Sequence, residues 1–239
     1  MSNVKRSVVV ACVGLLVLAG PASAAIIDDF STGSLAFVPA SSTSNSQTAG
    51  TMLGGERDET IVNTASSGGI LAGVSGGAYS YGALNATGSA LLSWDGTDGN
   101  AALDPVGLGG VDLTESGVQT HFAIEILSND FAADLILTVY TAVGDFSQIT
   151  VSTPGGIPSG PAQTLSIAFA DLLPTGAGAD FTNVGAITLE IDGSLEPQLD
   201  VTIGSFSTGT VVVPEPATAA QLGLGLVALG IQRRRARLS

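Results

Sequence analysis

Apolar and polar residues alternate along most of the chain between positions 118 and 206. The apolar members of the successive runs are Val118, Phe122, Ile124 and Ile126; Leu135, Leu137 and Val139; Ile149 and Val151; Leu165, Ile167 and Phe169; Ile187, Leu189 and Ile191; and Leu199, Val201 and Ile203. A period of two residues is typical of strands with one buried face, and turn-forming residues separate the runs. No long segment between positions 25 and 212 has a helical period. The pattern predicts an all-β fold, an antiparallel two-sheet sandwich of the jelly-roll kind.

Three further predictions concern the remaining parts of this sandwich. The apolar start of the domain, 26–30, is expected to pair near the closing strand, 199–206. Residues 39–51 are rich in Ser, Thr, Asn and Gln, so we expect them to form a mobile surface loop. Tyr79 and Tyr81 are two positions apart and should share one face of a strand.

The N-terminus has the pattern of a secretory signal peptide. Two basic residues precede an apolar run from 8 to 18, and Ala22 and Ala24 form an A-x-A cleavage site. We therefore expect residues 1–24 to form a signal helix that is removed on export, so that the mature protein begins at Ala25.

The C-terminus has three parts, namely a rigid polar break, a short apolar helix and a basic end. Pro214 and Pro216 favour an extended and accessible backbone. The apolar stretch 217–231 would make a helix about 22 Å long at roughly 1.5 Å per residue, which is short for a hydrocarbon core of ~30 Å. Four arginines then follow, which are expected to stop transfer and remain on the cytoplasmic side: Arg233, Arg234, Arg235 and Arg237.

This order resembles the PEP-CTERM sorting signal. The motif is carried by Val213, Pro214, Glu215 and Pro216, followed by a Leu/Gly-rich helix and the arginine cluster; Gln221 departs from it as a polar residue inside the helix. The resemblance implies a protein exported by a Gram-negative bacterium that makes exopolysaccharide. It implies transient anchoring in the inner membrane, processing by an exosortase-like membrane protease, and a final place at the cell surface or in the matrix.

The domain organisation that follows has three segments: a signal peptide at 1–24, a β-sandwich ectodomain at 25–212 and a sorting and anchor segment at 213–239. The ectodomain contains twenty Asp and Glu residues and a single base, Arg57, which gives a net charge of −19. Such a charge disfavours nucleic acid and anionic lipid as partners. The ectodomain contains no cysteine and is long enough to bury a core without disulfides.

One short loop has the composition of a calcium site. Asp95, Asp98 and Asn100 place three oxygen-bearing side chains close together in the sequence, and Ca²⁺ prefers such ligands. The spacing differs from that of an EF-hand, and Asp-Gly pairs also form ordinary hairpin turns, so both interpretations stay open. The preceding Trp94 is either a platform for a sugar ring or a core aromatic.

Other candidate residues have structural explanations. Arg57 could clamp a carboxylate or a sugar, but as the one cation of the ectodomain it is expected to pair with an acid across the sandwich. Residues 73–77 match G-x-S-x-G around Ser75, yet a Tyr-rich strand rather than a helix follows. His121 is expected on the outer face of its strand. No motif singles out a catalytic group, so we expect no enzyme activity and no required cofactor.

The sequence thus predicts an exported, non-enzymatic protein of the cell surface or exopolysaccharide matrix, sorted through its tail. Two alternatives remain open, a secreted glycan-binding module that could depend on calcium and a glycan-active enzyme with an unassigned carboxylate pair. The first and last strands of the domain loosely resemble those of extracellular carbohydrate-binding-module sandwiches. That resemblance rests on strand pattern and not on a motif, and it implies extracellular polysaccharide as a partner.

Overall fold

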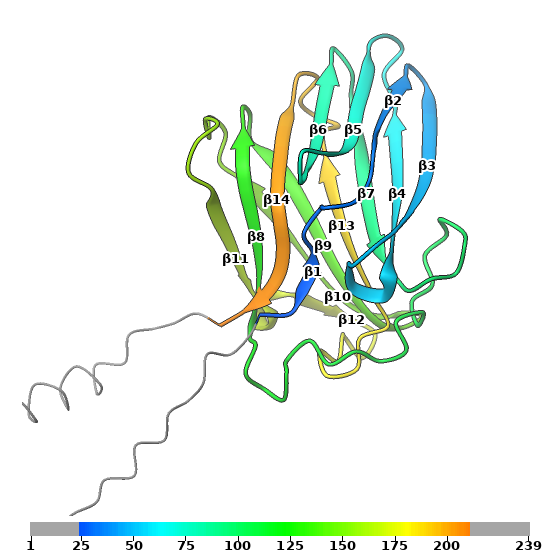
Figure 1. The fold of residues 1–239 in the computed structure, drawn as a ribbon, viewed down its shortest axis with the longest axis vertical. Coiled ribbons are helices and arrows are strands. Elements are labelled where there is room, and N and C mark those ends of the chain that lie inside the picture. The colour runs from blue at the N-terminus through cyan, green and yellow to red at the C-terminus, as the bar shows by residue number, and fades with distance from the viewer. Residues whose placement is uncertain (1–23, 211–239) are drawn as a thin grey trace, which may run out of the picture.

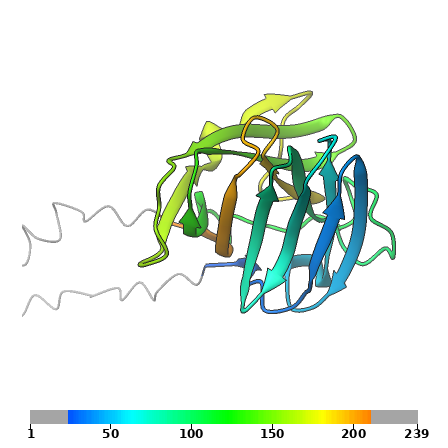
Figure 2. The ribbon, with the colours of Figure 1, turned by 90° about the horizontal axis from the view of Figure 1, so that it is seen from above.

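The alternating runs of the sequence become strands of two antiparallel sheets that pack face to face (Figures 1 and 2). The computed structural model describes residues 24–210. Sheet A has the order β11 (Gln163–Ala168), β8 (His121–Asn129), β14 (Asp200–Gly209), β6 (Ala78–Leu84), β5 (Gly69–Ser75) and β2 (Leu35–Pro39), and β1 (Ile26–Asp28) also pairs with β14. Sheet B has the order β12 (Leu173–Thr175), β10 (Asp145–Thr153), β9 (Ala133–Ala142), β13 (Ala186–Asp192), β7 (Gly88–Trp94), β4 (Glu56–Asn63) and β3 (Ser42–Ala49). The prediction of an all-β, antiparallel two-sheet sandwich is confirmed.

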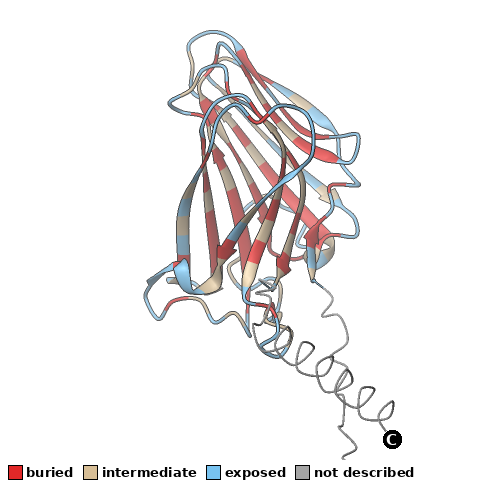
Figure 3. Ribbon diagram, turned by 90° about the vertical axis from the view of Figure 1, so that its left-hand side faces the viewer, coloured by how far each residue is buried: buried red, intermediate tan, exposed pale blue. Residues whose placement is uncertain are grey.

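The core lies between the two sheets and is built from the predicted apolar positions. On β8, Phe122, Ile124 and Ile126 are buried, and the intervening residues are more accessible. The alternation is visible along the strands in Figure 3, where buried segments follow more exposed ones. Tyr79 and Tyr81 share the inner face of β6, as predicted. Helical structure in residues 24–210 is limited to two 3-10 turns, η1 (Leu53–Gly55) and η2 (Phe169–Asp171).

Two sequence-based boundaries are wrong. The strand expected to start at Val118 starts at His121 instead, because Glu115 and Ser116 adopt left-handed φ angles of 45° and 62° in a turn. Val118 is 45% exposed as a result.

Most of the expected loop at 39–51 is a strand. Residues Ser42–Ala49 form β3, which pairs with β4 along its whole length and is the edge of sheet B. Its polar side chains alternate between half-buried and exposed positions. An edge strand forms backbone hydrogen bonds with a neighbouring strand on one side only. Polar side chains discourage another molecule from pairing with the open side, which explains why β3 has the composition of a loop.

The first and last strands are neighbours, as the sequence predicted. Strand β1 pairs with β14, the Thr208 amide donates to the Ala25 carbonyl over 2.8 Å, and the Ala25 amide donates to Thr208 Oγ1 over 3.1 Å. The two ends of the described chain therefore leave the sandwich side by side (Figure 1). None of the helices among residues 24–210 has the length and apolar character needed to cross a membrane. The predicted signal helix and tail helix lie outside the described residues.

Candidate functional site

Two rows of outward-facing residues cross four strands of sheet A. In the first row, Phe37 of β2 is opposite Leu71 of β5, Leu71 is opposite Gly82 of β6, and Gly82 is opposite Asp200 of β14. The second row consists of Leu35, Gly73, Ser80 and Thr202. Strands in a sheet lie ~4.8 Å apart, so each row is about 14 Å long. We call these eight residues the sheet A groove.

The β2 side of the groove is an exposed apolar platform. Phe37 is 59% exposed, and Leu35 and Leu71 beside it are also exposed. The ring of Phe37 lies against Gly69, where an added Cβ would be 2.3 Å from Phe37 Cζ. The missing side chain of Gly69 therefore lets the ring rest on the sheet while much of its surface stays accessible to a ligand.

Glycine also produces the hollow in the middle of the groove. A space of ≈ 330 Å³ is lined by residues of β2, β5, β6 and β14, including Leu71, Gly82 and Asp200. An added Cβ at Gly82 would lie 2.7 Å from Asp200 Oδ1. The carboxylate of Asp200 therefore occupies the position that a side chain on β6 would otherwise take.

The β14 side of the groove is polar. No hydrogen bond joins the hydroxyls of Ser80 and Thr202 or the carboxylate of Asp200 to another described residue. Burial, and then the charge of Asp130, raise the pKa of the Asp200 carboxyl. A second hollow of ≈ 270 Å³ continues past Asp200 and is lined by Asp130 and Phe131 among others. The groove thus combines an apolar platform with free polar groups, the usual composition of a small-ligand site.

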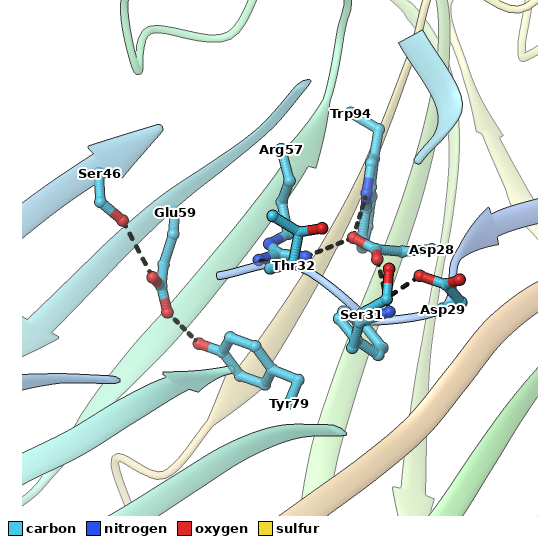
Figure 4. Close-up of polar contacts among 10 residues, drawn as sticks. Asp28, Asp29, Ser31, Thr32, Ser46, Arg57, Glu59, Tyr79 and Trp94 are labelled. Carbon is cyan, nitrogen blue, oxygen red and sulfur yellow. Dashed lines mark hydrogen bonds and ion pairs between the residues drawn. The ribbon is translucent and has the colours of Figure 1, made fainter. Parts of the chain in front are cut away.

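Inside the sandwich, Arg57 has the structural role that the sequence predicted. Its Nη1 donates to Asp28 Oδ2 over 2.6 Å, and its Nη2 donates to the Thr32 carbonyl over 2.9 Å (Figure 4). Trp94 Nε1 donates to the same Asp28 oxygen over 3.0 Å. Arg57, Asp28 and Trp94 are all buried. Trp94 is therefore a core aromatic and offers no platform to a sugar.

A second buried contact links the two sheets. Tyr79 Oη donates to Glu59 Oε1 over 2.6 Å, and Ser46 Oγ donates to Glu59 Oε2 over 3.0 Å (Figure 4). Burial, and then the Glu59 carboxylate, raise the pKa of Tyr79 well above its ordinary value. Tyr79 therefore stays protonated and serves as a fixed donor.

The predicted calcium residues are divided between two environments. Asp98 and Asn100 are exposed and bond to each other, with Asn100 Nδ2 donating to Asp98 Oδ2 over 2.8 Å. Asp95 is buried and accepts the Asp104 amide over 2.7 Å. The structure brings Asp98 close to Glu56 and Asp58, the two acids that flank Arg57 in the sequence.

Asp58 is the most perturbed carboxyl of this acidic cluster. Burial raises its pKa from 3.8 to about 7, helped by the charges of Asp95, Glu56 and Asp98. Burial also raises the pKa of Asp95. Because Asp58 is 2% exposed and Asp95 1%, the pair has no surface on which a polysaccharide could be cleaved.

The hydrolase-like motif is not a nucleophile elbow. Ser75 ends β5, Gly76 and Gly77 make the turn with φ of 64° and 80°, and β6 follows. His121 is half-buried, and its Nδ1 lies 2.7 Å from the hydroxyl of Thr120. The G-x-S-x-G match therefore belongs to a hairpin, as the sequence interpretation held.

Most residues of the sorting prediction lie outside the described part of the chain. These are Ala22 of the cleavage site, Val213, Pro214, Glu215 and Pro216 of the motif, and Arg233, Arg234, Arg235 and Arg237 of the basic end. Ala24 is described and exposed just before β1. An accessible position is compatible with cleavage there, which stays a prediction.

No family model matches the chain, and no curated protein matches it. Among solved structures, a family 11 carbohydrate-binding module from Clostridium thermocellum, in complex with a beta-1,3-1,4-mixed-linked tetrasaccharide, is similar over 77% of this chain and 94% of its own, with 11% identity and a TM-score of 0.39. An exo-beta-agarase is similar over 78% of this chain, with 12% identity and a TM-score of 0.40. The chain spans 25% of that enzyme's length. At these values no family is assigned.

Proposed function

We propose that this protein is an exported, non-enzymatic module that binds an uncharged polysaccharide in the sheet A groove. The observation that carries the proposal is the exposed Phe37–Leu71 platform in line with the free carboxylate of Asp200. The C–H face of a sugar ring packs on apolar side chains, and its hydroxyls donate to a carboxylate in strong charge-assisted hydrogen bonds.

The charge of the domain supports an uncharged ligand. The only Lys or Arg among the described residues, Arg57, is buried and paired with Asp28. Asp130 and Asp200 border the groove. The carboxylates of the groove would therefore repel an acidic polysaccharide, and no exposed cation of the described residues would offset that repulsion. The hydroxyls of a neutral sugar need only hydrogen-bond acceptors and donors.

The groove also continues beyond a single sugar site. Asp200 lines both hollows, so the polar part of the platform is shared between two adjacent spaces. An extended chain can occupy both, whereas a monosaccharide fills one. We therefore infer that the ligand is a polymer.

Affinity electrophoresis tests the proposal directly. Domain 25–212 should be retarded in native gels that contain a neutral polysaccharide such as laminarin or hydroxyethylcellulose, and it should not be retarded by alginate. Phe37→Ala and Asp200→Asn should each weaken the affinity derived from retardation roughly fivefold or more, because aromatic packing and a charge-assisted hydrogen bond are each worth about 1 kcal/mol or more.

Matched controls come from another hollow of the same protein. A space of ≈ 480 Å³ beside β12 is lined by Asp171 and Leu173 but by no aromatic residue. Leu173→Ala and Asp171→Asn should leave retardation unchanged. Loss of retardation in these controls, or its retention in Phe37→Ala, would place the glycan elsewhere. Release of new reducing ends from the polysaccharide would contradict a purely binding role.

We further propose that the tail sorts the protein to the cell surface or matrix through an exosortase-like protease. The support is the motif Val213–Pro216 together with the two ends of the described chain, which lie next to each other at one side of the sandwich. Mass spectrometry of the released protein should find Ala25 first and no arginine cluster. Released protein that retains Arg233 to Arg237 would reject tail processing.

A further inference from the structure

An acidic cluster lies on the outer face of sheet B, at the end where β4 begins and β7 ends. Glu56 and Asp58 are two residues apart on β4, so both side chains are on one face. The loop that follows β7 brings Asp98 to them, and carboxylate oxygens of Glu56, Asp58 and Asp98 lie within 4.8 Å of one another. Asp95, at the start of that loop, influences Asp58 through its charge.

The carboxylates of Glu56, Asp58 and Asp95 are buried, and each has at least one oxygen without a hydrogen-bond donor among the described residues. Asp58 is 2% exposed, and no N–H or hydroxyl among the described residues donates to either of its oxygens, so the carboxyl of Asp95 beside it can satisfy it only by sharing a proton. Glu56, 7% exposed, and Asp95, 1% exposed, each have one oxygen without a donor among these residues. Unpaired buried charge is strongly unfavourable, and buried charges in proteins are normally paired or coordinate metals.

The nearest base cannot provide that pairing. Arg57 lies between Glu56 and Asp58 in sequence, but alternation along β4 directs it to the opposite face, where it bonds Asp28 and Thr32. It is the only Lys or Arg among the described residues. The protein thus supplies no cation of its own on this face of sheet B.

We propose that Glu56, Asp58 and Asp98 bind one calcium ion, with Asp95 beside it. All three ligands are carboxylates, which are hard oxygen donors that suit Ca²⁺ or Mg²⁺ rather than a transition metal. Ca²⁺ accepts irregular sets of oxygens, whereas Mg²⁺ requires near-octahedral geometry and keeps several waters. Ligands that come from a strand and a loop form an irregular set, so the cluster suits Ca²⁺ better than Mg²⁺.

Calcium would join two parts of the fold that already touch. Thr97 Oγ1 donates to the Gly54 carbonyl over 3.2 Å, and the Asp104 amide donates to Asp95 Oδ2. The first contact holds the loop against η1, directly before β4, and the second closes the loop on itself. An ion between Asp98 and the β4 carboxylates adds an electrostatic link at the same place, so binding should stabilise the loop and the sandwich together.

Terbium luminescence tests the site without reference to the glycan proposal. Tb³⁺ is a luminescent substitute for Ca²⁺, and Trp94, the single tryptophan, directly precedes Asp95. Excitation of the indole in domain 25–212 should produce Tb³⁺ emission, which Ca²⁺ should displace at concentrations where Mg²⁺ has little effect. Glu56→Gln/Asp58→Asn should lose most of the emission.

Thermal unfolding provides the second readout. Ca²⁺ should raise the Tm of the wild type above its value in NaCl of matched ionic strength, and Glu56→Gln/Asp58→Asn should show no such difference. That variant removes like-charge repulsion, so it is expected to fold. The control Glu190→Gln/Asp192→Asn on β13 removes the same charge and should respond like the wild type.

Two results would overturn the site. One is an equal Tm in Ca²⁺ and matched NaCl for the wild type, which would mean that protons alone neutralise the cluster. The other is an undiminished Tb³⁺ signal in Glu56→Gln/Asp58→Asn, which would place the ion elsewhere. Polysaccharide retardation by the Phe37 platform is independent of both results, so failure here and failure of the proposed function are distinguishable.

Discussion

At the scale of single residues, the buried ion pair between Arg57 and Asp28 dominates the interior. Asp28 accepts three hydrogen bonds, from Arg57, from Trp94 and from the Phe30 amide. The pair joins the first strand of the domain to sheet B through two charges that are both nearly inaccessible. Such an interaction depends on both partners, because one charge left alone in the core is strongly destabilising.

Asp28→Asn should therefore destabilise the fold by about 3–5 kcal/mol, the usual effect of removing one member of a buried pair. Urea unfolding followed by Trp94 fluorescence measures it. Asp29→Asn is the matched control, because the Asp29 carboxylate is exposed and bonds to Ser31, two residues away; it should change stability little. Equal effects of the two substitutions would mean that the ion pair contributes nothing specific.

A pH dependence follows from Asp58. Its pKa is 3.8 in an ordinary environment and about 7 in the fold, so between these values the folded state keeps a proton that the unfolded state releases. Stability in EDTA should fall as pH rises from about 4 to about 7 and change little above that range. Urea unfolding at pH 5 and pH 8 measures the change.

Asp58→Asn is the control for this pH dependence, because it removes the titrating group. Its stability should change less between pH 5 and pH 8 than that of the wild type. In the wild type, added Ca²⁺ should restore stability mainly at the higher pH, where the ligands are ionised. A wild-type stability that rises with pH in EDTA would contradict the assignment.

At the scale of strands, the sheet A groove depends on the residues that face outward. Phe37, Leu71 and Asp200 come from strands distant in sequence, and their alignment results from the register of four strands. A glycine in each row removes a side chain in the middle, which leaves space between the platform and the polar end. The groove is thus a property of strand pairing more than of any single segment.

Filling this space should weaken polysaccharide binding without unfolding the domain. In Gly82→Ala the new methyl group would meet Asp200 Oδ1, the far end of a flexible side chain, while the Leu71 carbonyl stays 3.7 Å away. The displaced carboxylate should weaken retardation in a neutral polysaccharide gel about as much as Asp200→Asn. Unchanged retardation with an unchanged Tm would exclude Gly82 from the contact.

The strands themselves could be predicted from sequence because burial of one face requires apolar residues at every second position. Strand β3 was missed because a polar edge strand has no apolar face to bury. The groove was missed because Leu35–Val38 are all apolar, so no alternation distinguished the exposed Phe37 from the buried Val38. Asp95 and Asp98 were found by spacing, whereas their partners Glu56 and Asp58 could be recognised only from long-range pairing.

At the scale of the whole molecule, the adjacent chain ends make a circular permutant feasible. A short Gly/Ser linker between Ala25 and Gly209, with new ends at Gly76–Gly77, opens an exposed two-residue turn where an added Cβ meets nothing. Circular dichroism should show β structure, and thermal unfolding should show a cooperative transition. A second permutant, opened between Ile203 and Gly204 inside β14, should not fold. Failure of the first permutant would mean that the β5–β6 hairpin must be continuous.

The central place of β14 also affects the order in which the protein can fold. Sheet A holds this last strand between β8 and β6, with β1 also pairing to it. During synthesis, the sheet therefore lacks its middle strand until residues 200–209 have left the ribosome. Contacts this distant in sequence form slowly and late. An unfinished chain thus stays loosely packed, because the sandwich can close only once residues 200–209 are available. This late closure would suit the export proposed above, in which an unfolded chain passes through a translocation channel.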